Sequence, residues 1–296
     1  GIMGRYYALK DGEKAEVADA IRDHYKPLGP NDIAPSAPIS AALALTDKLD
    51  TLYWFFFFKQ RPTGSKDPFA LRRAALGVIR IIIENGFQIP LRGALDPISK
   101  VNMQVFSSEA ERTETIQSLL EFIADRLKVY LRDRGARHDL VDAVFSLPGQ
   151  DDLVLIVKRV EALSKFLSTE DGKSLLTAHD RAANILRIEE KKDNKQYTDE
   201  PSEQLIAAQG QPEERALLDA IFAMQKEADA ALSKADFEAA MRALARLRAP
   251  VDKFFDKVTV NAKEPALREN RLKLLSLIRR SMSKIADFSK IEGGAK

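Results

Sequence analysis

Residues 67–86 read DPFALRRAALGVIRIIIENG, and this stretch decides the fold class. Asp67 followed by Pro68 is typical of a helix start, because the carboxylate can accept a hydrogen bond from a free N–H group and proline has none to satisfy. Gly86, after an asparagine, is typical of a helix end. At 100° per residue, the apolar spacing places on one face Leu71, Ala74, Ala75, Val78 and Ile82. We therefore predict a helix of about 18 residues.

Arginines interrupt the other side of this helix. Arg73 and Arg80 fall on the stripe opposite the apolar face, with Arg72 to one side. Three apolar residues share the arginine side, namely Phe69, Leu76 and Ile83. The helix is therefore apolar almost all round, which favours cover on both sides. An arginine covered in this way needs an anionic partner, so we expect either a solvated arginine face or contacts with carboxylates or RNA phosphates.

Helical spacing recurs along nearly the whole chain, and no run of alternating β-branched residues indicates a strand. Further helices are predicted at 13–25, 39–58, 109–133, 139–147, 151–167, 173–191, 212–232, 236–245, from 250 onward, and 266–288. The polar stretch 191–210 is predicted to be a loop. We expect an all-α chain of multi-domain helical bundles.

Composition sets the class of protein. The 296 residues are 45% apolar and 30% charged, which is typical of a soluble globular chain of about two domains. The absence of cysteine excludes disulfides, thiolate zinc sites and cysteine nucleophiles. No apolar run approaches the roughly 20 residues of a membrane span. We expect a cytoplasmic protein, and the opening Gly1-Ile2-Met3-Gly4 leads us to expect a fragment of a longer one.

Positive charge is concentrated near the C-terminus. The net charge is +2, but residues 241–290 hold 13 Lys or Arg against 5 Asp or Glu, a balance of +8, and the remainder therefore sums to −6. A basic module on a mildly acidic body favours a polyanionic partner, although solvated helix faces also collect lysine and arginine.

Two motifs invite a chemical interpretation that their context disfavours. Residues 63–66, TGSK, precede a helix as a phosphate cradle does, yet a nucleotide P-loop needs a preceding strand and a different glycine spacing. The pair His138-Asp139 could be a metal dyad, but we favour a helix start with Asp139 as the cap. The three histidines are His24, His138 and His179, with no HExxH spacing, and we predict no catalytic residue.

An aromatic run, YWFFFF at 53–58, has neither strand alternation nor interleaved basic residues. We predict that it belongs to the core or to an interface.

Several stretches, taken together and in order, resemble the β subunit of the bacterial two-subunit glycyl-tRNA synthetase. They are GIMGRYYA at 1–8, EVA at 16–18, AI at 20–21, HY at 24–25, DKLDTL at 47–52, PTGSKDPFALRRAA at 62–75, RLKVYL at 126–131, RHDL at 137–140, RAANIL at 181–186, LRAPVDKFFD at 247–256, VN at 260–261 and NRL at 270–272. The resemblance spans nearly the whole chain and implies the C-terminal part of that subunit.

The resemblance implies three regions: a partial HD-like helical domain at 1–105, a helical middle region at 106–195, and an anticodon-binding-type helical domain at 196–296. In HD-type phosphohydrolases a metal is held by histidines and aspartates, and His24 and Asp47 would be vestiges of that site. Because the other ligands are missing from this chain, we expect the fold without a metal and without hydrolase activity.

The C-terminal region resembles the anticodon-binding domain of arginyl-tRNA synthetases, through Pro250, Val251, the FFD at 254–256, Arg271 and Leu272, and it coincides with the basic segment. Phe254 and Phe255 are expected in the core. Exposed cations are the better candidates for contact with tRNA phosphates. The candidates are Arg246, Arg248, Lys253, Lys257, Arg268 and Lys273, with Arg73 and Arg80 from the earlier helix.

In that family the α subunit activates glycine with ATP and Mg²⁺, and the β subunit binds and positions tRNA in an assembly of two α and two β subunits. The resemblance therefore implies a tRNA-positioning part of a ligase, without a complete active site of its own. Two other interpretations stay open at this point: an HD-type metal-dependent phosphohydrolase, and a helical scaffold that contacts only protein.

Overall fold

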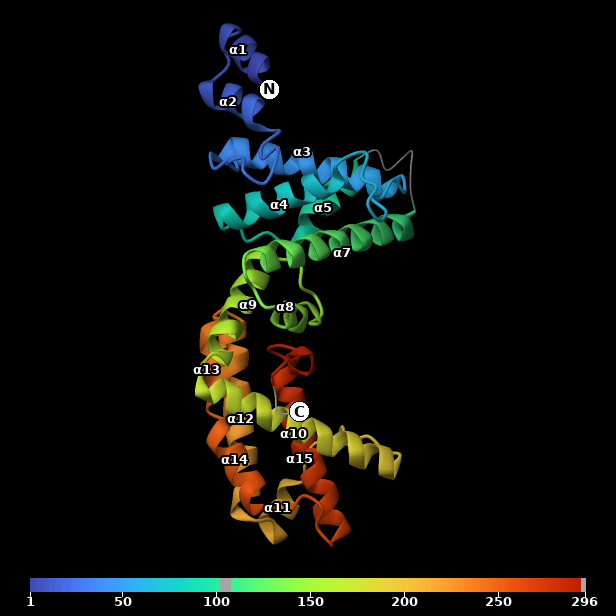
Figure 1. Ribbon diagram of the computed structural model, residues 1–296, viewed down its shortest axis with the longest axis vertical. Coiled ribbons are helices and arrows are strands. Elements are labelled where there is room, and N and C mark those ends of the chain that lie inside the picture. Colours follow the sequence, from blue (N-terminus) through green and yellow to red (C-terminus); the bar gives the residue numbers. More distant parts are fainter. Residues whose placement is uncertain (102–107, 294–296) are drawn as a thin grey trace. The chain divides into compact units, whose positions relative to one another are not determined.

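The computed structural model describes residues 1–101 and 108–293, and within these ranges the chain is built of helices, with no β-strand (Figure 1). The all-α prediction is confirmed. Within the same ranges no helix is both long enough and apolar enough to cross a membrane.

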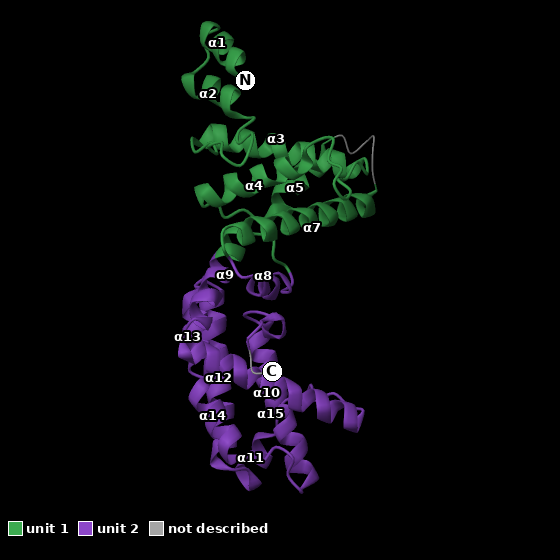
Figure 2. Cartoon of the chain, viewed as in Figure 1, with its two compact units in different colours: residues 1–135, 149–157 green, residues 136–148, 158–296 purple. Residues whose placement is uncertain are grey.

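The chain forms two compact units (Figure 2). Unit 1 comprises Gly1–Gly135 and Gly149–Val157, and unit 2 comprises Ala136–Pro148 and Lys158–Lys296. Of the two expected domain boundaries, the one at 105/106 lies outside the described residues and the one at 195/196 falls inside unit 2. The division into three domains stays a prediction.

Unit 1 is a layered arrangement of helices. They are α1 (Ile2–Lys10), α2 (Ala15–Asp23), α3 (Pro38–Phe57), α4 (Leu71–Asn85), α5 (Leu91–Lys100) and α7 (Glu109–Asp133). Helices α3, α4 and α7 pack against one another, and α1 and α2 extend from α3. Leu52, Ile79 and Leu119, one from each of these three helices, are fully buried. The sequence had predicted neither α1 nor α5.

Helix α4 begins later than its sequence predicts. Ala70 has a left-handed backbone with φ 55°, so Pro68 lies in a turn outside the helix, which starts at Leu71. The Asp67 carboxylate nevertheless accepts hydrogen bonds from the N–H groups of Leu71 (2.8 Å) and Arg72 (3.0 Å). Asp67 therefore stabilises the first turn from further away than a normal cap. The end at Gly86, with φ 68°, is confirmed.

The aromatic run at the end of α3 divides between core and surface. Tyr53 and Phe56 are buried, and the Phe56 ring lies 5.1 Å from that of Phe122 on α7. Phe58 is 54% exposed. The core prediction is confirmed for the two buried rings.

Unit 2 is also built of helices. They are α8 (His138–Phe145), α10 (Glu170–Asp193), α11 (Glu203–Gln209), α12 (Pro212–Leu232), α13 (Phe237–Ala245), α14 (Arg248–Lys257), α15 (Pro265–Ser283) and the 3₁₀ helix η1 (Phe288–Lys290). Helix α9 (Leu153–Leu167) runs from unit 1 into unit 2. Helix α12 packs against α13, α14 and α15, and α10 packs against α14 and α15.

The predicted loop at 191–210 contains the short helix α11, so that part of the prediction is wrong. The Ser202 hydroxyl caps it by accepting from the N–H of Leu205 at 3.3 Å, and Ile206 is buried. Seven residues are too few to show a helical period, which is why the pattern was missed.

A buried ion pair fastens α12 to α15. The Arg271 guanidinium donates from Nε (3.0 Å) and Nη2 (2.6 Å) to Oε1 of Glu214, a fully buried residue. Its Nη1 donates to the carbonyl of Thr259 at 2.8 Å. Because both charges are removed from water, their mutual contact is needed to keep either one inside the unit.

Candidate nucleic-acid interface

Helix α14 presents two lysines and is anchored by apolar residues on its other side. Val251 and Phe254 are fully buried in unit 2, which confirms Phe254 as a core residue. Lys253 and Lys257 lie one turn apart on the same face, both exposed, and neither forms an ion pair within the described part of the chain. Two exposed ammonium groups without an ion-pair partner among the described residues are suited to contact phosphates.

Phe255 is not a core residue. Its side chain is half-buried, and the guanidinium carbon of Arg181 lies 4.4 Å from the centroid of its ring. Arg181 belongs to α10 and is itself exposed. This cation therefore lies beside the lysine-bearing helix, a position that the sequence could not indicate because the two elements are 74 residues apart.

Arg246 and Arg248 lie at the start of the same region and are ion-paired. Arg246 is exposed and pairs with Glu227 of α12. Arg248 is half-exposed and pairs with Asp171 of α10 at 2.5 Å. Exposed ion pairs contribute little net free energy, so a phosphate could compete for either arginine.

Arg268 is not exposed as expected. Only 20% of its side chain is accessible, and its Nη2 donates to the carboxylates of Glu189 and Asp193 on α10, the second at 2.6 Å. The hydrogen bond from Arg268 holds the pKa of Glu189 below its usual range, and the same contact raises the pKa of Arg268. Arg268 thus fastens α15 to α10.

Lys273 is also engaged internally. Its side chain is 19% exposed, and its ammonium lies 3.1 Å from Glu269 and 3.4 Å from Asp199. The hydrogen bond with Glu269 raises the pKa of Lys273. The expectation of an exposed cation is therefore wrong here as well, because carboxylates from a neighbouring turn and from a distant segment converge on it.

Arg73 and Arg80, two of the arginines of α4, have different surroundings. Arg80 is buried, and its five N–H groups are all used: Nε and Nη2 donate to Glu84, Nη1 to the carbonyls of Gly29 and Pro30, and Nη2 also to that of Asp32. Arg73 is exposed and forms no ion pair within the described residues. The buried Arg80 thus has its partners within the protein. Arg73, by contrast, keeps its donors available.

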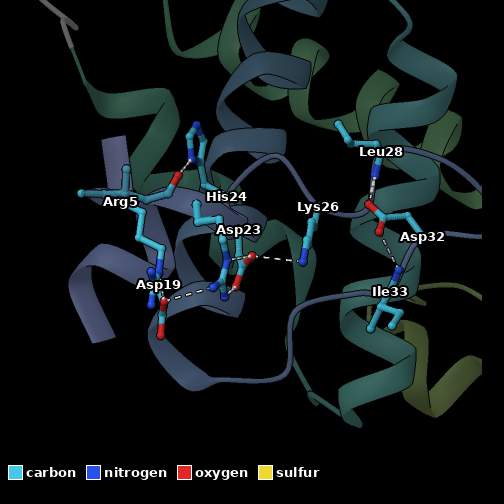
Figure 3. A network of polar contacts seen from close by, with 10 residues as sticks. Arg5, Asp19, Asp23, His24, Lys26, Leu28, Asp32 and Ile33 are labelled. Atoms are coloured by element: carbon cyan, nitrogen blue, oxygen red, sulfur yellow. Dashed lines mark hydrogen bonds and ion pairs between the residues drawn. The ribbon is translucent and has the colours of Figure 1, made fainter. Parts of the chain in front are cut away.

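The region of His24 is a network of internal polar contacts (Figure 3). Nδ1 of His24 lies 2.7 Å from the carbonyl oxygen of Ile21. Beside it, hydrogen bonds from Arg22 and Lys26 to Asp23 lower the pKa of that carboxyl to about 2. Within residues 1–101 and 108–293 no three His, Cys, Asp or Glu side chains gather as metal ligands would.

A buried lysine lies next to Asp47 and reaches this region. The Lys48 ammonium donates to the carbonyls of His24 and Tyr25, both at 3.2 Å, and burial lowers its pKa. Its aliphatic chain crosses Gly77 of α4 so closely that a Cβ there would lie 2.6 Å from Lys48 Cε. Gly77 therefore leaves room for the Lys48 side chain, which lies beside His24 and Asp47, the two candidates for a vestigial HD-type metal site.

Asp139 does not cap a helix. Helix α8 starts at His138, and the buried Asp139 carboxylate pairs with Arg137 at 2.5 Å and accepts from the N–H of Glu292 at 2.8 Å. The predicted capping role is wrong, because this carboxylate ties the C-terminal segment of unit 2 to α8.

The loop at 63–66 is a tight turn. Thr63 and Lys66 exchange backbone hydrogen bonds of 3.1 and 2.8 Å, with Gly64 at φ 48°. Its N–H groups are thus partly used within the turn, which agrees with the rejection of a P-loop.

Comparison with known proteins separates the chain into two matched regions. Residues 1–146 match the family described as glycyl-tRNA synthetase beta subunit, and residues 175–292 match the DALR anticodon binding domain. The chain belongs to the glycyl-tRNA synthetase beta subunit family.

Relatives in this family are similar over nearly the whole chain. The glycine–tRNA ligase beta subunits of Rhodospirillum centenum, Phenylobacterium zucineum and Paracoccus denitrificans are 53%, 52% and 49% identical to it, each over 99% of its length. The chain spans about 40% of the length of these relatives.

The two matched regions also divide the cations that are candidates for contact with tRNA. All six C-terminal candidates and the missed Arg181 lie within the DALR-matched residues 175–292. Arg73 and Arg80 lie within residues 1–146, as do two cations that the sequence did not single out, Arg126 on α7 and Arg134 directly after it. They had no signal beyond their charge, since only packing brings α7 against α4.

Proposed function

We propose that this chain is the tRNA-binding and tRNA-positioning part of a glycine–tRNA ligase β subunit. It would support the attachment of glycine to tRNA by a partner α subunit that uses ATP and Mg²⁺, in a cytoplasmic assembly of two α and two β subunits. The observation that carries the proposal is the coincidence of the DALR-matched region with the exposed, unpaired lysines of α14.

The mechanism we infer is positioning. Lys253 and Lys257 contact backbone phosphates, which supplies affinity without reading sequence. Arg246 and Arg248 can exchange a weak carboxylate partner for a phosphate. Holding the tRNA body in this way converts the meeting of its acceptor end with the activated glycine into a positioned, effectively unimolecular step.

Binding of glycine tRNA, measured by fluorescence anisotropy over a range of salt concentrations, tests the proposal. We expect salt-sensitive binding that the double variant Lys253→Gln/Lys257→Gln weakens by about tenfold, since each phosphate contact contributes to affinity and to its salt dependence. The matched control is Lys234→Gln, an exposed lysine of unit 2 with no ion pair among the described residues, in the turn between α12 and α13.

Three results contradict the proposal. They are no binding of tRNA by the unaltered protein at low salt, equal weakening by the control variant, and no effect of the double variant on glycylation by the assembled α and β subunits.

A further inference from the structure

A hollow of about 380 Å³ lies within unit 1, between α4 and α7 and beside the loop at Pro30. Five arginines line it, Arg72, Arg73 and Arg80 from α4, Arg126 from α7, and Arg134 at the end of α7. Its volume falls in the range of small-ligand sites, roughly 300–1,000 Å³. Unit 1 as a whole carries 19 Lys or Arg and 19 Asp or Glu, so this convergence does not follow from an overall excess of charge.

The positive charge of the hollow is largely uncompensated. Arg80 is matched by Glu84, and Asp133 is the one carboxylate in the described lining. Arg73, Arg126 and Arg134 form no ion pair within the described residues. Arg72 donates from Nη2 to the carbonyl of Gly64 at 2.6 Å, which leaves its charge unmatched. Guanidinium groups that converge without carboxylates favour a multiply charged anion.

Two buried polar atoms of α7 point to the same conclusion. Nε of Arg126 and the hydroxyl oxygen of Tyr130 are buried and have no hydrogen-bond partner among the described residues, and Tyr130 is only 8% exposed. Buried polar groups are nearly always hydrogen-bonded, so each one without a partner requires an explanation. Burial raises the pKa of Tyr130, which keeps its hydroxyl a donor. An oxyanion in the hollow could accept from these groups.

The aromatic ring in the hollow is not free to stack a base. The guanidinium carbon of Arg134 lies 4.3 Å from the centroid of the Tyr130 ring. Apolar contact is limited to aliphatic side chains such as Leu76 and Val129. The polar donors, rather than a stacking platform, therefore define the ligand.

We propose that this hollow binds a phosphate group, held by Arg73, Arg126 and Arg134, with the Tyr130 hydroxyl donating to one of its oxygens. The phosphate belongs either to a small phosphorylated molecule or to an RNA backbone, and the chemistry of recognition is the same for both. The proposal concerns unit 1 and does not depend on tRNA binding by α14.

Isothermal titration of the purified protein with inorganic pyrophosphate tests the free-phosphate source, and anisotropy with glycine tRNA tests the backbone source. We expect Arg73→Gln and Arg134→Gln each to weaken binding about tenfold in one of the two arms, because each removes a charge-assisted contact. The matched control is Arg132→Gln, an exposed arginine of α7 outside the lining whose Nε donates to the carbonyl of Lys128.

Tyr130→Phe separates binding from folding. It removes only the unpartnered hydroxyl, so the free energy of unfolding should stay equal or rise, while binding weakens about threefold. Loss of pyrophosphate binding in the lining variants identifies a small phosphorylated ligand, and loss of tRNA affinity alone identifies the RNA backbone.

The proposal is overturned if the lining variants bind both probes as the unaltered protein does, if the unaltered protein binds neither, or if Arg132→Gln has an equal effect. Pyrophosphate binding that persists while the unaltered protein fails to bind tRNA would reject the proposed function and leave this site standing.

Discussion

The two units of this chain use positive charge in opposite ways. In unit 2 the basic C-terminal segment directs much of its charge inward, as Arg268 and Arg271 each pair with a carboxylate of another helix. In unit 1 the basic and acidic residues balance, yet Arg73 and Arg126 converge on a hollow without carboxylate partners. A charge excess in the sequence therefore does not locate the charge available to a ligand.

The largest expected effect concerns the inward charge of unit 2. Arg271→Met should lower the free energy of unfolding by about 3–5 kcal/mol, because it leaves the Glu214 carboxylate buried without its partner. Urea denaturation measures the loss. The double variant Arg271→Met/Glu214→Gln should recover part of it, and a loss below about 1 kcal/mol for the single variant would show that the pair is not structural.

Variants of Arg80 and Arg73 test whether these two residues of α4 differ in the way their contacts indicate. Arg80→Met should lower the free energy of unfolding by about 2–4 kcal/mol, since three backbone carbonyls and Glu84 lose their donor. Arg73→Met, on the exposed side of the same helix, is the control and should change it by less than about 0.5 kcal/mol. Equal losses of free energy of unfolding in the two variants would contradict the different roles of Arg80 and Arg73.

Arg268 and the lysines of α14 can be compared through the salt dependence of tRNA affinity in their variants. The double variant Lys253→Gln/Lys257→Gln should reduce the slope of log affinity for tRNA against log salt by about 1.8, at about 0.9 for each phosphate contact. Arg268→Gln should lower the thermal midpoint and leave that slope unchanged, because its guanidinium is held by Glu189 and Asp193. A fall in slope for Arg268→Gln would place it on the RNA.

The smallest expected effect is the pH dependence of the stability that Asp23 contributes to unit 1. The pKa of Asp23 is lowered from 3.8 to about 2 by its contacts with Arg22 and Lys26. The contribution of this carboxylate to the free energy of unfolding is therefore present above about pH 4 and is lost as the pH falls through about 2. Asp23→Asn should lower the free energy of unfolding at pH 7 by about 1 kcal/mol or less, since both cations are half-exposed. Urea denaturation from pH 7 to pH 2.5 should show that the difference in free energy of unfolding between Asp23→Asn and the unaltered protein becomes smaller. A constant difference would contradict the lowered pKa of Asp23.

Much of the fold was predictable because helix signals are local. Apolar spacing and terminal residues predicted α12 at its observed bounds and the end of α4 at Gly86. The start of α4 was misplaced because the left-handed Ala70 is not visible in a sequence. Helix α11 was missed because seven residues do not show a period.

The candidate site was less predictable. Lys253 and Lys257 are exposed as expected, whereas Arg268 and Lys273 are not, since their carboxylate partners include residues far away in the chain. Arg181 could not be placed beside Phe255 from the pattern, because the cation and the ring belong to helices that only folding brings together.

The all-α class, most of the helices and the family can be inferred from the sequence, because helix periodicity, capping residues and ordered motifs are properties of neighbouring residues. Which cations are free follows from packing. An ion pair depends on a carboxylate that packing brings within about 4 Å, and packing joins residues that lie dozens of positions apart. For that reason Arg80 is a structural residue and Arg73, seven positions earlier on the same stripe of α4, faces the hollow with its donors available.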